Sequence, residues 1–307
     1  MGRPPRTPPV QSAEIELPHR YTRRAYQRAF WTEMEHGRRY AVLVWHRRAG
    51  KDTTAFNWLI TASQQRVGNY YYVFPTMALG RKLIWEGMNE VGMAFLDHIP
   101  PALIKDRNET DMRVEFHNRS AFQIVGSDRF DTMRGPNPVG VLLSEYSEQN
   151  PGAWQVLAPI IRQNKGWAVF VYTPKGKNHA YTLFNMARSN PEWFAQRLTV
   201  EDTGVFTPED LAAEIASGID DASIQQEYYC SFEGSVQGAF YQRELALAHA
   251  EGRIGRVPYD PGTPWRRRGI SGRGTRMRSG STSRSAARSI SSTTTRRRGR
   301  ISRCWPP

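Results

Sequence analysis

The sequence is poor in cysteine and lacks any long apolar run. Its 307 residues include two cysteines, Cys230 and Cys304, which cannot form a disulfide framework and lie in no spacing typical of a zinc site. No run of 18 or more apolar residues is present, and the first residues lead into a polar, Pro-rich segment rather than an apolar signal core. With 39% hydrophobic residues, the chain is predicted to be a globular protein of a reducing compartment, with no membrane association.

Acidic residues are absent from the last part of the chain. Residues 265–307 contain 13 of the 42 Lys and Arg residues and no Asp or Glu, which leaves 29 basic against 29 acidic residues in 1–264. The net charge of +13 therefore belongs to the tail, and it is no evidence that the folded part binds nucleic acid.

Apolar runs and helical patterns alternate over the first two thirds of the chain. After a helix-rich segment at 16–37, helices are predicted at 53–65, 81–95 and 154–163, and strands at 70–76, 113–116, 121–126, 139–145 and 167–174. This alternation predicts an α/β fold with a mostly parallel sheet covered by helices on both faces. Residues 175–259 are predicted to be helix-rich.

A candidate phosphate-binding loop follows the apolar run Ala41–Trp45. His46-Arg47-Arg48-Ala49-Gly50-Lys51-Asp52-Thr53 forms a Gly-Lys turn that opens a helix, where backbone N–H groups and the lysine bind phosphates. Arg48, Ala49, Gly50, Lys51, Asp52 and Thr53 are the predicted nucleotide-binding residues. Trp45 replaces the usual first glycine and Asp52 the usual Mg²⁺-binding hydroxyl, so an ordinary strand-to-helix turn is the alternative.

A second candidate group ends another apolar strand. Glu145 follows Val141–Ser144, which is typical of ATPases in which a glutamate orients or activates the attacking water. Ser144 occupies the position of a metal-binding aspartate. We therefore hypothesise that Asp52, with Thr53 or the Ser144 hydroxyl, binds Mg²⁺. An equally weighted alternative is that Asp52 only favours the helix N-terminus.

Other candidates gain weight only from their place beside these motifs. Thr173, at the end of 167–174, would lie near the γ-phosphate, although Thr-Pro usually marks a turn. Tyr26 and Gln27 could stack on and hydrogen-bond adenine, or lie on an ordinary helix surface. Arg47, Arg48 and Arg134 are candidates for stabilising transition-state charge, although isolated arginines are usually solvated.

Taken in order, these segments resemble the ATPase half of a tailed-bacteriophage terminase large subunit. The resemblance covers roughly residues 15–245 and rests on Tyr26-Gln27, His46–Asp52, Phe74-Pro75-Thr76, Asp131-Thr132-Met133-Arg134-Gly135, Leu143–Tyr146, Trp167 and Thr173–His179. It implies a P-loop ATPase of the additional-strand, catalytic-glutamate type, with an adenine contact at Gln27, a catalytic Glu145 and a coupling residue at Thr173. It also implies that Arg47 acts within its own subunit and Arg134 on a neighbour's nucleotide.

The resemblance further implies ATP and Mg²⁺ as cofactors and translocation of double-stranded DNA into a procapsid. Its implied partners are a homo-oligomeric ring, a portal protein and a terminase small subunit, and the implied location is the host-cell cytoplasm at the procapsid portal. Two other interpretations are kept: a helicase-like nucleic-acid ATPase, and a nucleotide-binding remnant that does not hydrolyse.

The resemblance also leads us to expect a metal-dependent nuclease after Tyr259, but the acid-free tail cannot build one. Its Arg/Ser-rich composition predicts disorder. Codons can be chosen for Trp265–Gly272 that, after restoring one base, read V-E-T-A-W-D-L-G, a strand-like pattern with an aspartate. We interpret the tail as a frameshifted nuclease start. The predicted organisation is a disordered 1–15, a P-loop core at 16–185, a helix-rich subdomain at 186–260 and a disordered tail at 261–307.

Overall fold

The computed structural model describes residues 15–89, 92–233, 248, 251–253, 266–270 and 278–282. The chain divides into two units, 1–242 and 243–307. In the described part of the chain, no helix is long and apolar enough to cross a membrane. The predicted disordered N-terminus lies outside the described residues, except for Ile15.

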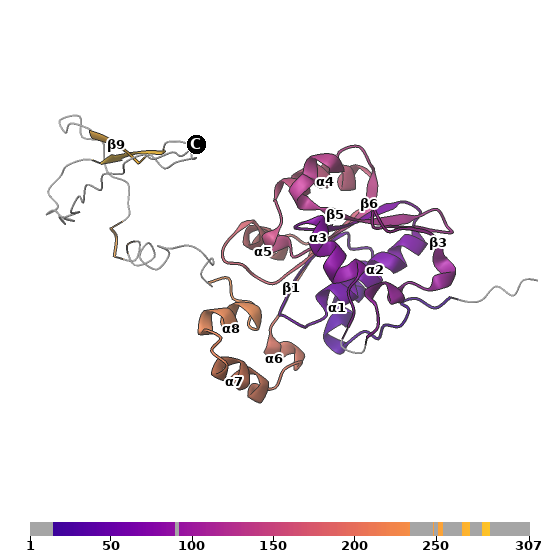
Figure 1. Ribbon diagram of the computed structural model, residues 1–307, viewed down its shortest axis with the longest axis horizontal. Helices are drawn as coiled ribbons and strands as arrows, with labels where there is room; N and C mark the ends of the chain where they lie inside the picture. Colours follow the sequence, from indigo (N-terminus) through magenta and orange to yellow (C-terminus); the bar gives the residue numbers. More distant parts are fainter. Residues whose placement is uncertain are drawn as a thin grey trace, which may run out of the picture. The chain divides into compact units, whose positions relative to one another are not determined.

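The first unit alternates strands and helices (Figure 1). Its strands are β1 (Tyr40–Trp45), β2 (Asn69–Phe74), β3 (Ile104–Asn108), β4 (Arg113–Phe116), β5 (Ala121–Gly126), β6 (Pro138–Ser144), β7 (Trp167–Tyr172) and β8 (Trp193–Leu198). Its α-helices are α1 (Arg28–Glu35), α2 (Lys51–Gln65), α3 (Met77–Gly80), α4 (Gly152–Gln163), α5 (His179–Ser189), α6 (Val200–Thr203), α7 (Pro208–Ala216) and α8 (Asp221–Glu227). The other helical segments are η1 (Ala25–Gln27), η2 (Arg81–Trp85), η3 (Phe95–His98), η4 (Pro101–Leu103), η5 (Ser127–Met133) and η6 (Tyr146–Glu148). All are 3-10 helices except η2, which is a π-helix.

The eight strands form one mixed sheet in the order β3-β4-β5-β2-β6-β7-β1-β8. In the part of the sheet ordered β5-β2-β6-β7-β1-β8, all neighbouring strands are parallel. The β3–β4 and β4–β5 pairs are antiparallel. The central strands β1, β6 and β7 are almost entirely buried, as expected for apolar runs inside a parallel sheet. The predicted α/β fold with a mostly parallel sheet is confirmed.

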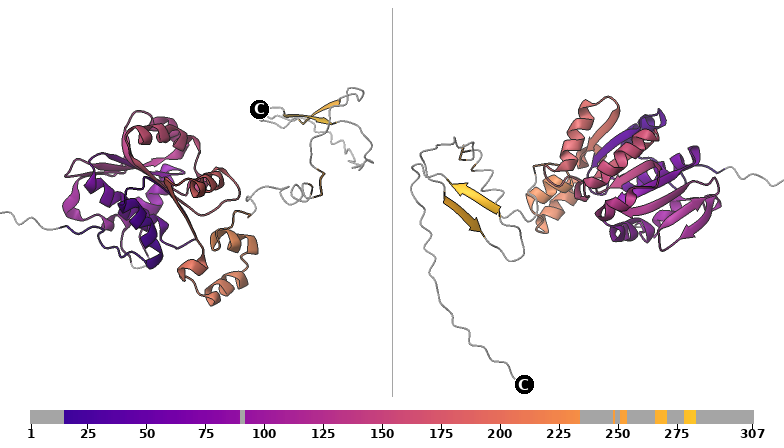
Figure 2. Two further views of the ribbon diagram at one scale, coloured as in Figure 1. Left: turned by 180° about the vertical axis from the view of Figure 1, so that it is seen from behind. Right: turned by 90° about the horizontal axis from the view of Figure 1, so that it is seen from above.

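Helices cover both faces of this sheet (Figure 2). Along β1, Ala41, Leu43 and Trp45 join a core with α1 and α2, whereas Val42 and Val44 join a second core with α4 and α5. This alternation follows from the two-residue period of a strand, which sends successive side chains to opposite faces. The sheet therefore separates two hydrophobic cores within three layers.

Three sequence predictions need correction. The helix predicted at 81–95 is wrong in extent, because helical structure runs through α3 and η2 and stops at Trp85. At Gly87 an added Cβ would lie 2.0 Å from the Leu83 carbonyl oxygen, and the chain there is extended enough for Met88 to bridge Ala94. The strands β3 and β8 were not predicted. Because β8 pairs with β1, the sheet continues past residue 185, where the sequence predicts the core to end.

In the second unit, β9 (Arg266–Ile270) pairs antiparallel with β10 (Arg278–Thr282). These two strands differ from the disorder predicted for residues 261–307. The rest of that segment, including most of the interpretation as a frameshifted nuclease start, lies outside the described residues.

Candidate active site

The candidate site lies at the carboxyl ends of β6, β7 and β1, which are adjacent in the sheet. The loop after β1 turns sharply, with φ of 68° at Arg48 and 72° at Gly50. A Cβ on Gly50 would lie 3.1 Å from Nε2 of Gln27, so both conformation and space favour glycine there. Gly50 is the N-cap of α2, and the first backbone N–H groups of this helix form the kind of site that binds phosphate.

Lys51, the first residue of α2, connects the three strand ends. Its Nζ lies 3.3 Å from Oε1 of Glu145 and donates a hydrogen bond of 3.3 Å to Oγ1 of Thr173. The lysine is only 9% exposed. Burial by itself lowers the pKa of Lys51, but the Glu145 and Asp52 carboxylates raise it by more, so that it stays above its ordinary value. The structure thus brings three of the predicted catalytic residues together around one charged group.

Glu145 has a left-handed backbone conformation, with φ of 51°. The turn that carries it is held by Gln149, whose Nε2 donates to the carbonyl oxygens of Val73 (2.9 Å) and Ser144 (2.7 Å). Such a conformation in a residue other than glycine is costly and is found preferentially at functional sites. Burial raises the pKa of the Glu145 carboxyl above its ordinary value, and Lys51 opposes this shift.

Asp52 and Ser144 are in direct contact. The Ser144 hydroxyl donates to Oδ1 of Asp52 at 2.5 Å, and the Tyr72 hydroxyl donates to the same oxygen at 2.9 Å. Burial raises the pKa of Tyr72, and the Asp52 carboxylate raises it further, so the phenol stays a donor. The sequence analysis does not predict Tyr72 as a site residue, because an aromatic residue in β2 looks like any other buried strand residue.

These oxygen donors fit a magnesium ion. Mg²⁺ prefers carboxylate, hydroxyl and phosphate oxygens and is usually bound through one or two carboxylates with substrate phosphates. The described residues contain no group of three or more His, Cys, Asp and Glu side chains that could hold a metal ion, so any ion here would also need oxygens from hydroxyls, phosphates or water. Of the three predicted metal ligands, the structure pairs Asp52 with Ser144, while Thr53 lies partly exposed on the next position of α2.

Gln27 is hydrogen-bonded to the phosphate-binding loop and stabilises its conformation. Its Nε2 donates to the Ala49 carbonyl oxygen at 3.2 Å, and its Oε1 accepts hydrogen bonds from Tyr21 and from the Arg24 backbone N–H. The side chain is 1% exposed. Tyr26 donates to the same Ala49 oxygen at 3.1 Å. Both predicted adenine-contacting residues thus contact the loop itself.

Gln27 also lines a cavity of about 390 Å³ beside the loop. Arg48, Gly50 and Thr53 of the loop and the first turn of α2 are also among its lining residues. Its apolar lining residues are Leu83, Met88, Met93 and Phe95. A cavity lined by both charged and apolar side chains can take a ligand that has a charged part and an apolar part.

The three candidate arginines lie on the surface. Arg47 and Arg48 are exposed in the loop, and Arg134 is exposed after η5, where it forms an ion pair of 3.3 Å with Asp131. Exposed pairs of this kind contribute little to stability. Among the described residues, the ion-pair partner of Arg134 is Asp131, whereas that of Glu145 is Lys51.

The beginning of the loop is tied to the segment after β8. His46 is fully buried, its Nε2 lies 2.6 Å from the Thr203 hydroxyl, and its backbone N–H donates to Leu198. The Arg47 N–H donates to the Glu227 carbonyl oxygen. Burial lowers the pKa of His46, which favours the neutral form of the ring. This connection between α6, α8 and the loop was not predicted, and the sequence holds no local signal for it.

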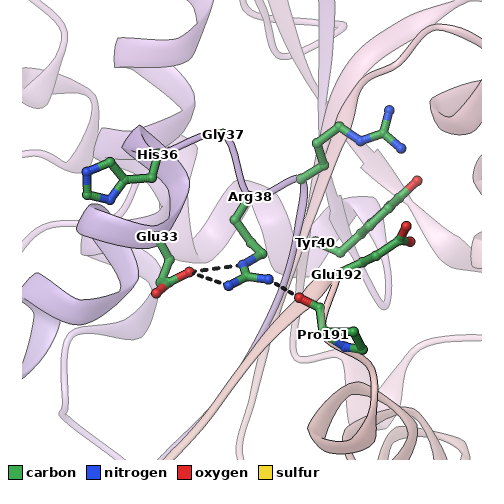
Figure 3. Close-up of a pocket in the computed structure, with 8 residues that line it drawn as sticks. Glu33, His36, Gly37, Arg38, Tyr40, Pro191 and Glu192 are labelled. Atoms are coloured by element: carbon green, nitrogen blue, oxygen red, sulfur yellow. Dashed lines mark hydrogen bonds and ion pairs between the residues drawn. The ribbon is translucent and has the colours of Figure 1, made fainter.

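A separate pocket lies at the other end of β1 (Figure 3). Its volume is about 440 Å³, and its walls include His36, Tyr40 and Glu192. Arg38 crosses it, paired with Glu33 at 2.7 Å and hydrogen-bonded to the Pro191 carbonyl oxygen. Tyr40 is the first residue of β1 and Trp45 the last. This pocket therefore lies at the amino end of β1, whereas Lys51 follows its carboxyl end.

Comparison with solved structures defines the class of fold. The ATPase domain of the Thermus phage P74-26 large terminase is similar over 63% of this chain and 88% of its own, with a TM-score of 0.52 and 22% identity. The large terminase of a thermophilic bacteriophage, solved in complex with ADP, is similar over 64% of this chain, with a TM-score of 0.52 and 12% identity. This chain spans about half of that second terminase, 48%. No family model matches the chain, and no curated protein matches it.

Because the sequence identities are only 22% and 12%, the similarity establishes the fold of this chain and nothing beyond it. The chain has an α/β fold built on a mixed, mostly parallel sheet of eight strands, which matches the ATPase domain of the P74-26 large terminase. Among proteins with this architecture it is structurally similar to the ATPase domains of phage large terminases, as its sequence motifs predict.

Proposed function

We propose that this chain is an ATP-hydrolysing subunit of a phage DNA-packaging motor. The observation that carries the proposal is the position of Lys51, held at 3.3 Å from both Glu145 and Thr173 where three parallel strands end. A lysine for the outer phosphates and a glutamate for the attacking water are two of the groups that ATP hydrolysis on this fold uses. The structural similarity to terminase ATPase domains supports the choice among motors.

Each residue then has a defined task. Lys51 and the N–H groups of Gly50 and the first turn of α2 bind the β- and γ-phosphates. Glu145 accepts the proton of the attacking water or orients it, and its raised pKa makes it a stronger base than an exposed carboxylate. Thr173 contacts Lys51 from β7 and so senses whether a γ-phosphate competes for that lysine.

The cavity beside the loop is the proposed site for adenine and ribose, between Arg48 and the apolar residues around Phe95. Mg²⁺ would be held by Asp52, with Ser144 and Thr53 nearby, and would supply charge neutralisation at the β- and γ-phosphates. Arg47 would stabilise transition-state charge within the subunit. Arg134, which is exposed and paired with Asp131, would act on the nucleotide of a neighbouring subunit in a ring.

The test is phosphate release by the full chain with and without double-stranded DNA. We expect ATP turnover that DNA stimulates, and a loss of at least about a hundredfold in Lys51→Ala and in Glu145→Ala. Glu192→Ala, an exposed glutamate at the opposite edge of the sheet, is the matched control and should leave turnover unchanged. ATP binding without turnover in the unaltered chain would instead support a nucleotide-binding remnant, and strand separation would support a helicase-like ATPase.

A further inference from the structure

The two positions that bind the metal in motor ATPases carry exchanged side chains here. In P-loop ATPases a Ser or Thr hydroxyl follows the loop lysine, and an aspartate ends the neighbouring strand. In this chain Asp52 follows Lys51, and Ser144 ends β6. One carboxylate and one hydroxyl are therefore still present, each at the other's position.

The structure brings the exchanged pair into contact. The Ser144 hydroxyl donates to Oδ1 of Asp52 at 2.5 Å, and Ser144 is fully buried. The contact joins the beginning of α2 to the end of β6, with the carboxylate on the helix and the hydroxyl on the strand. A hydroxyl facing a carboxylate is thus preserved, while donor and acceptor have changed places.

A third residue fixes the orientation of the carboxylate. The Tyr72 ring is fully buried on β2, with the Phe74 ring centroid 4.5 Å away and the Phe56 ring stacked at 5.9 Å. Its hydroxyl donates to Oδ1 of Asp52 at 2.9 Å. Both donors use Oδ1, so among the residues that the structure describes Oδ2 is the oxygen that they leave available for a ligand.

The helix N-terminus alone does not account for this arrangement. An acidic residue in the first turn of a helix is favoured by the helix dipole, and Asp221 in α8 has that position while exposed to solvent. A role of that kind needs no buried hydroxyls directed at the carboxylate. Two such donors restrict Asp52 to one orientation, which is what the outer hydrogen-bond partners of a metal ligand do.

We propose that Asp52 is the carboxylate ligand of the divalent ion that accompanies the nucleotide. Ser144 is the hydroxyl that pairs with this carboxylate, and Tyr72 is a residue that positions it. The assignment rests on the proposed function, because the ion binds together with a nucleotide. With this assignment the negatively charged ligand comes from the first turn of α2, directly after the phosphate-binding Gly50 and Lys51, rather than from the end of β6.

The experiment measures Mn²⁺ binding to the full chain in the presence of ADP, by electron paramagnetic resonance of the free ion. Asp52→Asn keeps the shape of the side chain and should weaken Mn²⁺ binding at least about tenfold. Asp221→Asn is the matched control and should bind Mn²⁺ as the unaltered chain does. Asp52→Ser alone should bind weakly, and the double variant Asp52→Ser/Ser144→Asp should recover most of the affinity, because it restores one carboxylate and one hydroxyl.

Tyr72→Phe keeps the ring packing and removes only the hydroxyl, so we expect Mn²⁺ affinity to fall about tenfold while the melting temperature of the metal-free protein changes little. Unchanged Mn²⁺ affinity in Asp52→Asn would overturn the assignment even if the double variant did not fold. Absence of Mn²⁺ and ADP binding in the unaltered chain would count against the proposed function itself, which separates the two failures.

Discussion

The hydroxyl of Thr173 accepts a hydrogen bond of 3.3 Å from Nζ of Lys51, across the carboxyl ends of β7 and β1. The same lysine lies 3.3 Å from Glu145. Lys51 therefore has two partners from the sheet, and a γ-phosphate would compete with both. Replacing this contact by a phosphate is a local change at the end of β7, the kind of event that can report the nucleotide state to the rest of a motor.

The first prediction concerns Thr173. Thr173→Val removes the hydroxyl with almost no change in shape, so Lys51 loses one partner while Glu145 remains. We expect a loss of stability of about 1 kcal/mol and, in phosphate-release assays, turnover that DNA no longer stimulates. Thr173→Ser keeps the hydroxyl and should retain stimulation. Equal stimulation in the Val and Ser variants would contradict a coupling role.

The second prediction separates two roles of Gln27. Gln27→Ala removes three hydrogen bonds from a side chain that is 1% exposed, so we expect the protein to lose about 1–3 kcal/mol of stability. Binding of ATP and GTP is then compared. A bracing role predicts weaker binding of both nucleotides, whereas an adenine contact predicts a loss confined to ATP. Gln64→Ala, a partly exposed glutamine at the far end of α2, is the control.

The third prediction tests action between subunits. Lys51→Ala and Arg134→Ala chains are each expected to be inactive, for different reasons. If Arg134 acts on a neighbour's nucleotide, mixing the two chains places an intact Arg134 beside an intact P-loop in part of the ring, and turnover should reappear. Arg47→Ala mixed with Lys51→Ala should stay inactive, because Arg47 is proposed to act in its own subunit. Recovery in both mixtures, or in neither, would contradict this division.

The fourth prediction is a pH dependence. Burial raises the pKa of Glu145 above the ordinary value of about 4.3. Because Glu145 is proposed to act as a carboxylate, kcat should rise with pH through this raised pKa. Exposed Glu148 contributes to the shift by repulsion, so Glu148→Gln should move the acid limb to lower pH. An acid limb at or below the ordinary pKa of glutamate would contradict the assignment of Glu145 as the base.

The raised pKa of Glu145 also predicts how the free energy of unfolding depends on pH. A carboxyl whose pKa is higher in the folded than in the unfolded state stabilises the fold at pH values below its unfolded pKa, and this contribution disappears as the pH rises through the folded pKa. The free energy of unfolding of the unaltered chain, compared with that of Glu145→Gln, should therefore fall as the pH increases through that range. Denaturant unfolding at several pH values measures it.

Much of the sheet could be predicted because its central strands are continuous apolar runs. The segments that became β1, β2, β6 and β7 are buried along nearly their whole length, so burial dictates their composition. β3 is different: four of its five residues are exposed, and Ile104–Asn108 has no alternating pattern that marks a strand. β8 is partly exposed at the sheet edge, so its residues also follow no clear period.

The candidate site divides in the same way. Lys51, Glu145 and Thr173 could be predicted because each follows an apolar run, and parallel strands bring their carboxyl ends to one edge. The bracing by Gln149, the tie from His46 to Thr203 and the phenol of Tyr72 could not. These contacts join residues far apart in the sequence, and nothing in the local composition distinguishes them from ordinary core or turn residues.

The pairing of β1 has a consequence for the order of folding. Tyr40, at the start of the strand that leads to the P-loop, pairs with Ala168 on one side and Trp193 on the other. Both neighbours are made long after β1 during synthesis, and contacts between such distant segments form slowly. A chain ending at residue 185 would leave β1 as an open edge. The strand that leads into the phosphate-binding loop therefore obtains both of its neighbours only once the chain has been made as far as Leu198.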